Sequence, residues 1–180
     1  KLCDVRIAED AVECLQGNLV RSHAVGVGAP VPDEIVRLML ALKIQSLVRG
    51  HSAVQPVVVE RLLDFLNHDI LPIVPSQGSV GASGDLAPLA HLALPLLGEG
   101  LVRVGGVTMP ALDALAKFGL NPVSPAAKDG LALINGTQFM GAYGAWIMHR
   151  AWLLAYVADV AISMSLEGMR GLIAPFDPRI

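Results

Sequence analysis

The sequence has little charge, little cysteine and few aromatic side chains. Of its 180 residues, 16% are charged, 4% are aromatic and two are cysteine, and the formal net charge is -3. Charge this sparse and balanced forms no basic block, so nucleic acid is not an expected partner. Cys3 and Cys14 are too few for a disulfide framework and fit no metal-ligand spacing, so we expect a reducing, cytoplasmic location and no metal site.

The chain also lacks a recognisable leader. It begins at Lys1 without an initiator methionine, a cationic segment or an apolar leader segment, which predicts an excised part of a longer protein. The longest uncharged run, residues 131–148, has the length of a membrane span but is interrupted by Asn135, Thr137, Gln138 and several glycines. We therefore expect no membrane partner.

What the sequence has in abundance is apolar residues, at 53%, repeating with helical period. Three early helices are predicted, one from about Glu9 to His23, one beginning at Asp33 and one beginning at Pro56. The residues expected to be buried are Ala8, Val12, Leu15 and Leu19 in the first helix. They are Ile35, Leu38, Met39 and Leu42 in the second, and Val59, Leu62, Leu63 and Leu66 in the third.

Later segments extend the helical pattern. Asp85 can cap a helix that runs to about Leu97. The stretch "LVRVGGVTM", residues 101–109, alternates around Gly105-Gly106 and predicts a small β-hairpin. From Thr137 to about Met169 a helix is apolar on nearly every side, which is typical of burial among subunits. The expected fold is all-α, with this long buried helix and the one hairpin, and residues 1–180 show no domain boundary.

The stretch "GSVGASGDLAPLAH", residues 78–91, places small residues directly before an apolar helix. A phosphate-binding loop would have Lys and then Ser or Thr after Gly84, where Asp85 and Leu86 stand. A serine-nucleophile turn of the form G-x-S-x-G is one position out of register. Neither motif therefore accounts for the stretch.

The backbone itself provides another chemistry. The amide nitrogen of Gly84 could attack the carbonyl carbon of Ala82, and loss of the Ser83 hydroxyl as water would leave an exocyclic methylene. Glycine has no Cβ to obstruct the attack and tolerates strained dihedral angles, alanine keeps the carbonyl uncrowded, and serine provides the leaving group. The product is an electrophile that ordinary side chains do not offer.

This stretch resembles the signature of the aromatic amino acid ammonia-lyases, in which Ala-Ser-Gly cyclises autocatalytically to methylidene-imidazolone. "LQGNLVRSHAVGVGAPVP" at 15–32, "GLALINGTQFM" at 130–140 and "APFDPRI" at 174–180 are also similar to family segments, in the same order. The resemblance covers essentially the whole chain. Within the family the sequence is most similar to the histidine-specific members, which convert histidine to urocanate.

The resemblance assigns roles to individual residues. Ala82, Ser83 and Gly84 would form the electrophile, which engages the substrate amine while a base removes a β-proton. Asn135 would hydrogen-bond the cofactor region and the amino acid, and His23 would contact the substrate imidazole. Asp85 and Gln138 would support them.

The resemblance also implies that parts of the site lie elsewhere. The family's tyrosine base would precede Lys1, and further site residues would follow Ile180, so we expect this chain alone to be inactive. Whether Ser83 cyclises in this chain stays open from the sequence. Full-length members are homotetramers with active sites shared between subunits. In such a tetramer the other subunits would cover the long apolar helix.

Other interpretations remain open from the residues. Ser83 could belong to a plain capped turn, or could act with His91 as a serine hydrolase that lacks an identifiable acid partner. The chain could be a catalytically inactive helical interaction module on a lyase scaffold, or part of a lyase specific for tyrosine or phenylalanine. His51, His68, His91 and His149 share no spacing and are predicted to be surface or packing residues.

Overall fold

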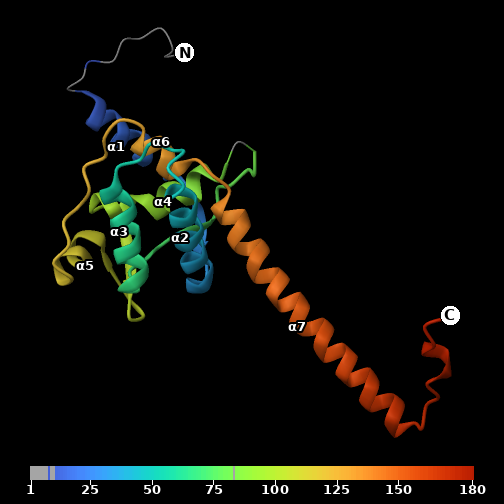
Figure 1. Ribbon diagram of the computed structural model, residues 1–180. Coiled ribbons are helices and arrows are strands. Elements are labelled where there is room, and N and C mark those ends of the chain that lie inside the picture. The colour runs from blue at the N-terminus through green and yellow to red at the C-terminus, as the bar shows by residue number, and fades with distance from the viewer. Residues whose placement is uncertain (1–7, 9–10, 83) are drawn as a thin grey trace. The chain divides into compact units, whose positions relative to one another are not determined.

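The computed structural model describes residues 8, 11–82 and 84–180, which group into two compact units, Lys1–Tyr143 and Gly144–Ile180. Helices dominate both units, as Figure 1 shows, and the expected all-α class is confirmed. The helices are α1 (Val12–His23), α2 (Asp33–Leu47), α3 (Pro56–Asn67), α4 (Leu86–Ala93), α5 (Ala111–Lys117), α6 (Asp129–Ile134) and α7 (Gln138–Gly168), with short 3₁₀ helices η2 (Leu94–Leu97) and η3 (Ala174–Phe176).

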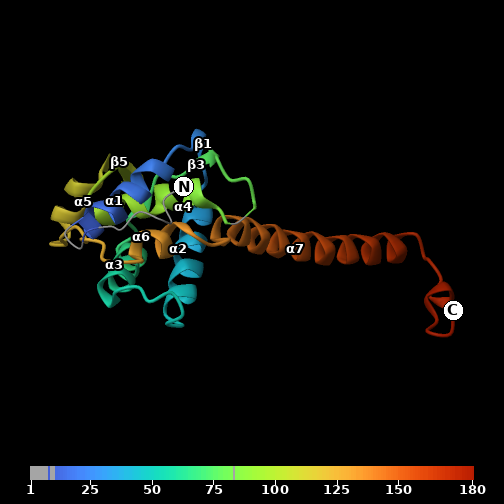
Figure 2. The same cartoon turned by 90° about the horizontal axis from the view of Figure 1, so that it is seen from above.

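The predicted hairpin is present and is joined by a strand that the sequence did not predict. Strands β4 (Leu101–Val104) and β5 (Val107–Pro110) pair antiparallel around Gly105-Gly106, and β2 (Leu71–Pro72) pairs with the other edge of β4. A second antiparallel pair joins β1 (Val27–Pro30) to β3 (Pro75–Gln77), and Figure 2 shows these two strands together. This second pair ties the segment after α1 to the segment that leads into the glycine-rich stretch.

Helix α4 lies at the centre of the first unit. It contacts α1, α6, β2 and β3, and its residues are apolar on every side, so nearly all of them are buried. Leu89 and Leu92 are among the most deeply buried side chains of the chain. Because its first residue follows Asp85 directly, this central helix fixes one end of the glycine-rich stretch in the core.

Helices α2 and α3 begin where the sequence predicts, at Asp33 and Pro56, and the predicted helix from Asp85 continues beyond Ala93 as η2. The start of the first predicted helix, at Glu9, lies outside the described residues. The buried faces differ from those predicted. The buried residues of α1 are Gly17 and Val20. Those of α2 are Ile35, Val36, Met39, Leu40, Lys43, Ile44 and Leu47. Those of α3 are Val58, Leu62 and Phe65.

The long apolar helix exists as α7, and its predicted burial among other subunits stays a prediction. Gln138 and Ala142 are the buried residues of α7, and both lie near its start. Farther along, apolar side chains such as Trp152, at 74% exposed, and Leu154, at 70%, face solvent. A helix that is apolar on all sides needs neighbours on all sides, which is the reason for expecting other copies of the chain around it.

Ala53 offers a test of backbone strain in the loop before α3. It is an exposed alanine with a φ of 51°, in the left-handed region that disfavours any residue with a Cβ. We expect Ala53→Gly to raise the free energy of unfolding by about 0.5–1 kcal/mol, since relief of strain outweighs the added freedom of the unfolded chain. Urea denaturation measures this change.

A matched control separates strain from the general effect of glycine. Ala41 is exposed within α2, where the backbone is ordinary helix. Ala41→Gly should therefore lower the free energy of unfolding by about 1 kcal/mol. If both substitutions destabilise the chain equally, the left-handed strain at Ala53 is absent in solution.

Candidate active site

Gly84 is held in a space that admits no side chain. Its φ is 111°, and a Cβ placed on it would lie 3.0 Å from Asn135 Oδ1 and 3.0 Å from both the nitrogen and the oxygen of Gly136. Residues 84 and 135 are brought together because α4 begins where α6 ends, and these two helices pack on each other. The structure thus brings together two of the residues that the resemblance placed in the site. Ser83 lies outside the described residues.

Asp85 is fully buried and connects the glycine-rich stretch to α7. Its carboxylate accepts hydrogen bonds from the Ser79 hydroxyl at 2.6 Å and from the Met140 N–H at 3.0 Å. Its own N–H donates to the carbonyl of Gly136 at 2.7 Å. Asp85 does stand just before α4, but its side chain makes no capping hydrogen bond to that helix, so the predicted capping role is wrong. The carboxylate instead satisfies donors from two other segments.

The contacts of Asp85 give a graded prediction. Asp85→Ala would leave the Met140 N–H and the Ser79 hydroxyl without their buried acceptor, so we expect the free energy of unfolding to fall by about 2–4 kcal/mol. Asp85→Asn keeps one oxygen for Met140, and the Ser79 hydroxyl can rotate to accept from the amide. The free energy of unfolding of Asp85→Asn should therefore fall by less than about 1.5 kcal/mol. Denaturant titration of both variants would refute this assignment if the two losses were equal.

His23 and Gly84 line the same pocket, which has a volume of about 210 Å³. His23 is the last residue of α1, and its Nδ1 lies 2.8 Å from the carbonyl oxygen of Leu19. A carbonyl oxygen can only accept, so this contact assigns the imidazole proton to Nδ1 and leaves Nε2 as an acceptor. The remaining lining residues are mostly apolar and come from the segments on either side of the glycine-rich stretch, namely Ser22, Val25, Gly78, Val80, Leu86 and Ala87.

Gln138 lies beside this cluster but does not line the pocket of His23. It is a buried residue at the start of α7, and its amide fills the space where a Cβ of Gly136 would be. Among the described residues its Oε1 has no hydrogen-bond partner. Gln138 therefore contacts the segment that backs Gly84, which fits a supporting position.

Sequence reasoning missed Lys43. This lysine of α2 is only 1% exposed, and its Nζ donates to the backbone carbonyl of Asn135 at 2.9 Å. Burial lowers its pKa from 10.5 to about 7. The available indication was its place on the apolar face of α2, between Leu40 and Leu47, where a lysine is out of pattern.

His91 is a packing residue, as the sequence predicted. Its Nε2 accepts a hydrogen bond from the Gly26 N–H at 3.0 Å, and partial burial lowers its pKa. Because Nε2 is occupied as an acceptor, it is not available to take a proton from a serine. Within the described residues no group of three or more histidine, cysteine, aspartate or glutamate side chains could hold a metal ion.

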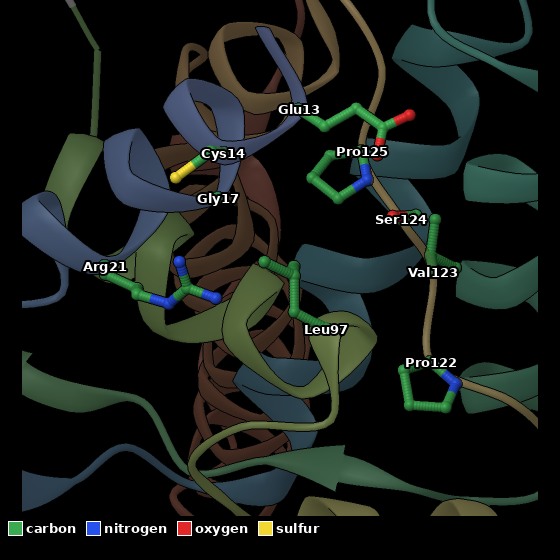
Figure 3. A pocket seen from close by; sticks show the side chains of 9 residues that line it. All are labelled: Glu13, Cys14, Gly17, Arg21, Leu97, Pro122, Val123, Ser124 and Pro125. Atoms are coloured by element: carbon green, nitrogen blue, oxygen red, sulfur yellow. The ribbon is translucent and has the colours of Figure 1, made fainter. Parts of the chain in front are cut away.

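A larger pocket, of about 430 Å³, lies away from this cluster, between α1 and residues 122–125. Figure 3 shows the side chains of Arg21, Cys14 and Glu13 around it. The Arg21 guanidinium already contacts the Glu99 carboxylate, at 2.6 Å for the closest pair of atoms. None of the residues that the sequence placed in the site lines this pocket, so its size does not make it the functional site.

The helical fold and the sequence together define the class of protein. The chain belongs to the aromatic amino acid lyase family, whose model matches residues 1–180. The histidine ammonia-lyase of Geobacillus thermodenitrificans (strain NG80-2) is 54% identical over 180 residues, which are 100% of this chain and 36% of that protein.

Solved structures agree with this membership. The crystal structure of histidine ammonia-lyase from Trypanosoma cruzi superposes with a TM-score of 0.93 at 42% identity, covering 99% of this chain and 35% of that one. The tyrosine aminomutase from Streptomyces globisporus has a TM-score of 0.89 at 40% identity, over 95% of this chain and 32% of that one. The chain thus spans about a third of the length of the relatives it matches.

Proposed function

We propose that the whole protein carrying these residues eliminates ammonia from histidine to give urocanate. The observation that carries the proposal is the pocket shared by His23 and Gly84, with Gly84 packed against Asn135 and Gly136. The similarity to histidine ammonia-lyases over the entire chain supports the same reaction. Histidine is the substrate, and the chain by itself is expected to be inactive.

The residues present fit methylidene-imidazolone formed from Ala82, Ser83 and Gly84. The cradle around Gly84 leaves no space for a Cβ, and the left-handed φ of this residue requires glycine. Such a group provides an electrophile that turns the substrate amine into a better leaving group. Asn135 Oδ1 lies 3.0 Å from the place that a Cβ of Gly84 would take, which supports a contact of its amide with the cofactor region.

His23 gives the site its preference for an imidazole. With its proton on Nδ1, held by the Leu19 carbonyl, its Nε2 accepts a hydrogen bond from the N–H of a substrate imidazole. A phenylalanine ring has no N–H to donate, and it would cover this part-buried acceptor without giving it a partner. The other residues that line the pocket are mostly apolar and offer few competing polar groups.

A tyrosine-specific reaction is the second candidate, because a tyrosine aminomutase has a similar fold and its substrate hydroxyl could also donate to His23. Relative kcat/KM for histidine and tyrosine distinguishes the two. The higher identity to histidine ammonia-lyases favours histidine. A catalytically inactive interaction module would turn over neither amino acid.

Assembly into a homotetramer in the cytoplasm is part of the proposal. By length and composition alone, the helical stretch Asp129–Gly168 could cross a membrane, although core helices of soluble proteins pass the same test. We assign its exposed apolar side chains to contacts with other copies of the chain rather than with lipid. Light scattering of the whole protein tests this, since a detergent-free monomer would contradict it.

Turnover and mass together test the proposed function. The whole protein, incubated with histidine, should produce urocanate, and its intact mass should be lower than the mass predicted from its sequence by two waters, mapped to the peptide that holds residues 82–84. Ser83→Ala should remove both the mass deficit and the turnover. The unmodified mass together with no urocanate from the whole protein would refute the lyase proposal, and urocanate from residues 1–180 alone would refute the expectation that this part is inactive.

A further inference from the structure

Lys43 is a buried amine that the proposed reaction does not use. Its side chain is enclosed between elements of the core, and its Nζ is 2.9 Å from the carbonyl oxygen of Asn135. Burying an ammonium group costs free energy, and a similarly shaped apolar residue would often stabilise a core more. A lysine on the buried face of α2 therefore calls for a function other than packing.

The carbonyl that Lys43 holds belongs to the segment behind Gly84. Asn135 ends α6, so its carbonyl has no partner further along that helix, and Lys43 provides the donor. The next carbonyl, of Gly136, accepts from the Asp85 N–H at 2.7 Å. Two consecutive carbonyls are thus held by donors from two segments, α2 and the residue before α4, and the 135–136 backbone forms the wall that a Cβ of Gly84 would strike.

We propose that Lys43 is a positioning residue for formation of the electrophile. By holding the Asn135 carbonyl, it keeps the backbone of residues 135–136 against Gly84. This contact keeps the Gly84 nitrogen close to the Ala82 carbonyl carbon. Because a trans peptide directs its C=O and N–H to opposite sides, the same contact also sets the direction of the Gly136 N–H. The inference rests on the proposed function, since it concerns the same cyclisation.

The covalent step that Lys43 assists is balanced without an outside reagent. A bond forms between the Gly84 nitrogen and the Ala82 carbonyl carbon, and the carbonyl oxygen leaves as water with the amide hydrogens of Gly84 and Ser83. A second water takes the Ser83 hydroxyl and the hydrogen on its Cα, which leaves the exocyclic methylene. Lys43 exchanges no atoms and acts through the Asn135 carbonyl, so its effect falls on the rate of ring closure.

The test follows mass loss in the whole protein after synthesis, comparing wild type with Lys43→Met and Lys43→Arg. Methionine fills similar volume and removes the cost of burying the amine, but it leaves the Asn135 carbonyl without this donor, so the thermal midpoint should change little. Loss of two waters should slow at least about tenfold, as expected for removal of one hydrogen bond. Arginine retains a donor and should restore most of the rate. Lys117→Met, on an exposed position of α5, is the matched control and should cyclise like wild type.

Each outcome decides the matter. Cyclisation of Lys43→Met at the wild-type rate overturns the proposal. A lower thermal midpoint of Lys43→Met that accounts for its slower cyclisation, and that Lys43→Arg does not restore, also overturns it, because Lys43 would then only cap α6. If Lys43→Met shows no cooperative unfolding, Lys43→Gln replaces it, since this shorter polar side chain loses the contact with Asn135 and keeps a polar group in the space. A wild-type protein that never loses the two waters overturns the proposed function and this inference together. If wild type and Lys43→Met both lose the two waters at the same rate, only the inference is overturned.

Discussion

Gly84→Ala in the whole protein should abolish both loss of the two waters and turnover of histidine. The added methyl group would stand 3.0 Å from three atoms of Asn135 and Gly136, two of which are backbone and cannot rotate away. A φ of 111° adds strain for any residue with a Cβ. Relief requires Gly84 to move away from the 135–136 backbone, which displaces the nitrogen that must attack Ala82. We expect turnover to fall by about a thousandfold or more, the scale seen when a site loses its reacting group.

Gly105→Ala separates the collision from the backbone strain. Gly105 also has a positive φ, 57°, but a Cβ on it would meet nothing within 4 Å, because it lies at the tip of the β4–β5 hairpin. This control should lower the free energy of unfolding by about 1 kcal/mol and leave mass loss and turnover intact. Normal cyclisation in Gly84→Ala would show that the cradle does not position the reacting nitrogen.

Local sequence features predicted most of the helices and the hairpin. Asp33 and Pro56 mark the starts of α2 and α3, and Gly105-Gly106 forms the turn between β4 and β5, because both glycines adopt positive φ. These elements depend on interactions within a few residues, which the sequence contains directly. The pairing of β1 with β3 was not predictable in the same way. It joins segments more than forty residues apart, and Pro30 and Pro75 at its end resemble loop residues.

The buried face of α1 was harder to predict, because its packing against α6 uses glycine where large residues were expected. In α1, Leu15 is 38% exposed while Gly17 is buried. A Cβ on Gly130 of α6 would lie only 2.7 Å from the carbonyl oxygen of Gln16, so α1 and α6 meet through backbone. Periodicity counts apolar side chains and gives no weight to glycine, so this close approach was invisible to it.

The candidate site was predicted from the resemblance, and its geometry could not be derived from the sequence. Nothing in the spacing of Gly84 and Asn135 shows that they touch, since the contact depends on how α4 and α6 pack. Lys43 was missed for a related reason: its partner is a backbone carbonyl, and a carbonyl has no sequence signature. In α7 the apolar pattern was interpreted correctly as a helix, but its burial depends on neighbours beyond the residues described here.

The stability of the protein should depend on pH through Lys43. Burial lowers the pKa of this amine from 10.5 to about 7 in the folded protein, while the unfolded chain keeps the ordinary value. Between these two values the unfolded state binds a proton that the folded state does not, so unfolding takes up a proton and raising the pH favours the folded protein. Below the lower value both states are protonated, and the penalty of the buried charge is present in full.

Lys43→Met isolates this contribution. The quantity to compare is the free energy of unfolding of wild type minus that of Lys43→Met. This difference should be level below about pH 7 and increase above it by roughly 1 kcal/mol per pH unit. Methionine removes the titrating amine and leaves the other titrating groups in place. Urea denaturation of both proteins from pH 6 to about pH 9 measures the difference, with Lys117→Met as a control whose difference from wild type should be level throughout. A level difference for Lys43→Met as well would mean that water reaches the amine, and that its hydrogen bond to the Asn135 carbonyl is not the enclosed contact that positions the wall behind Gly84.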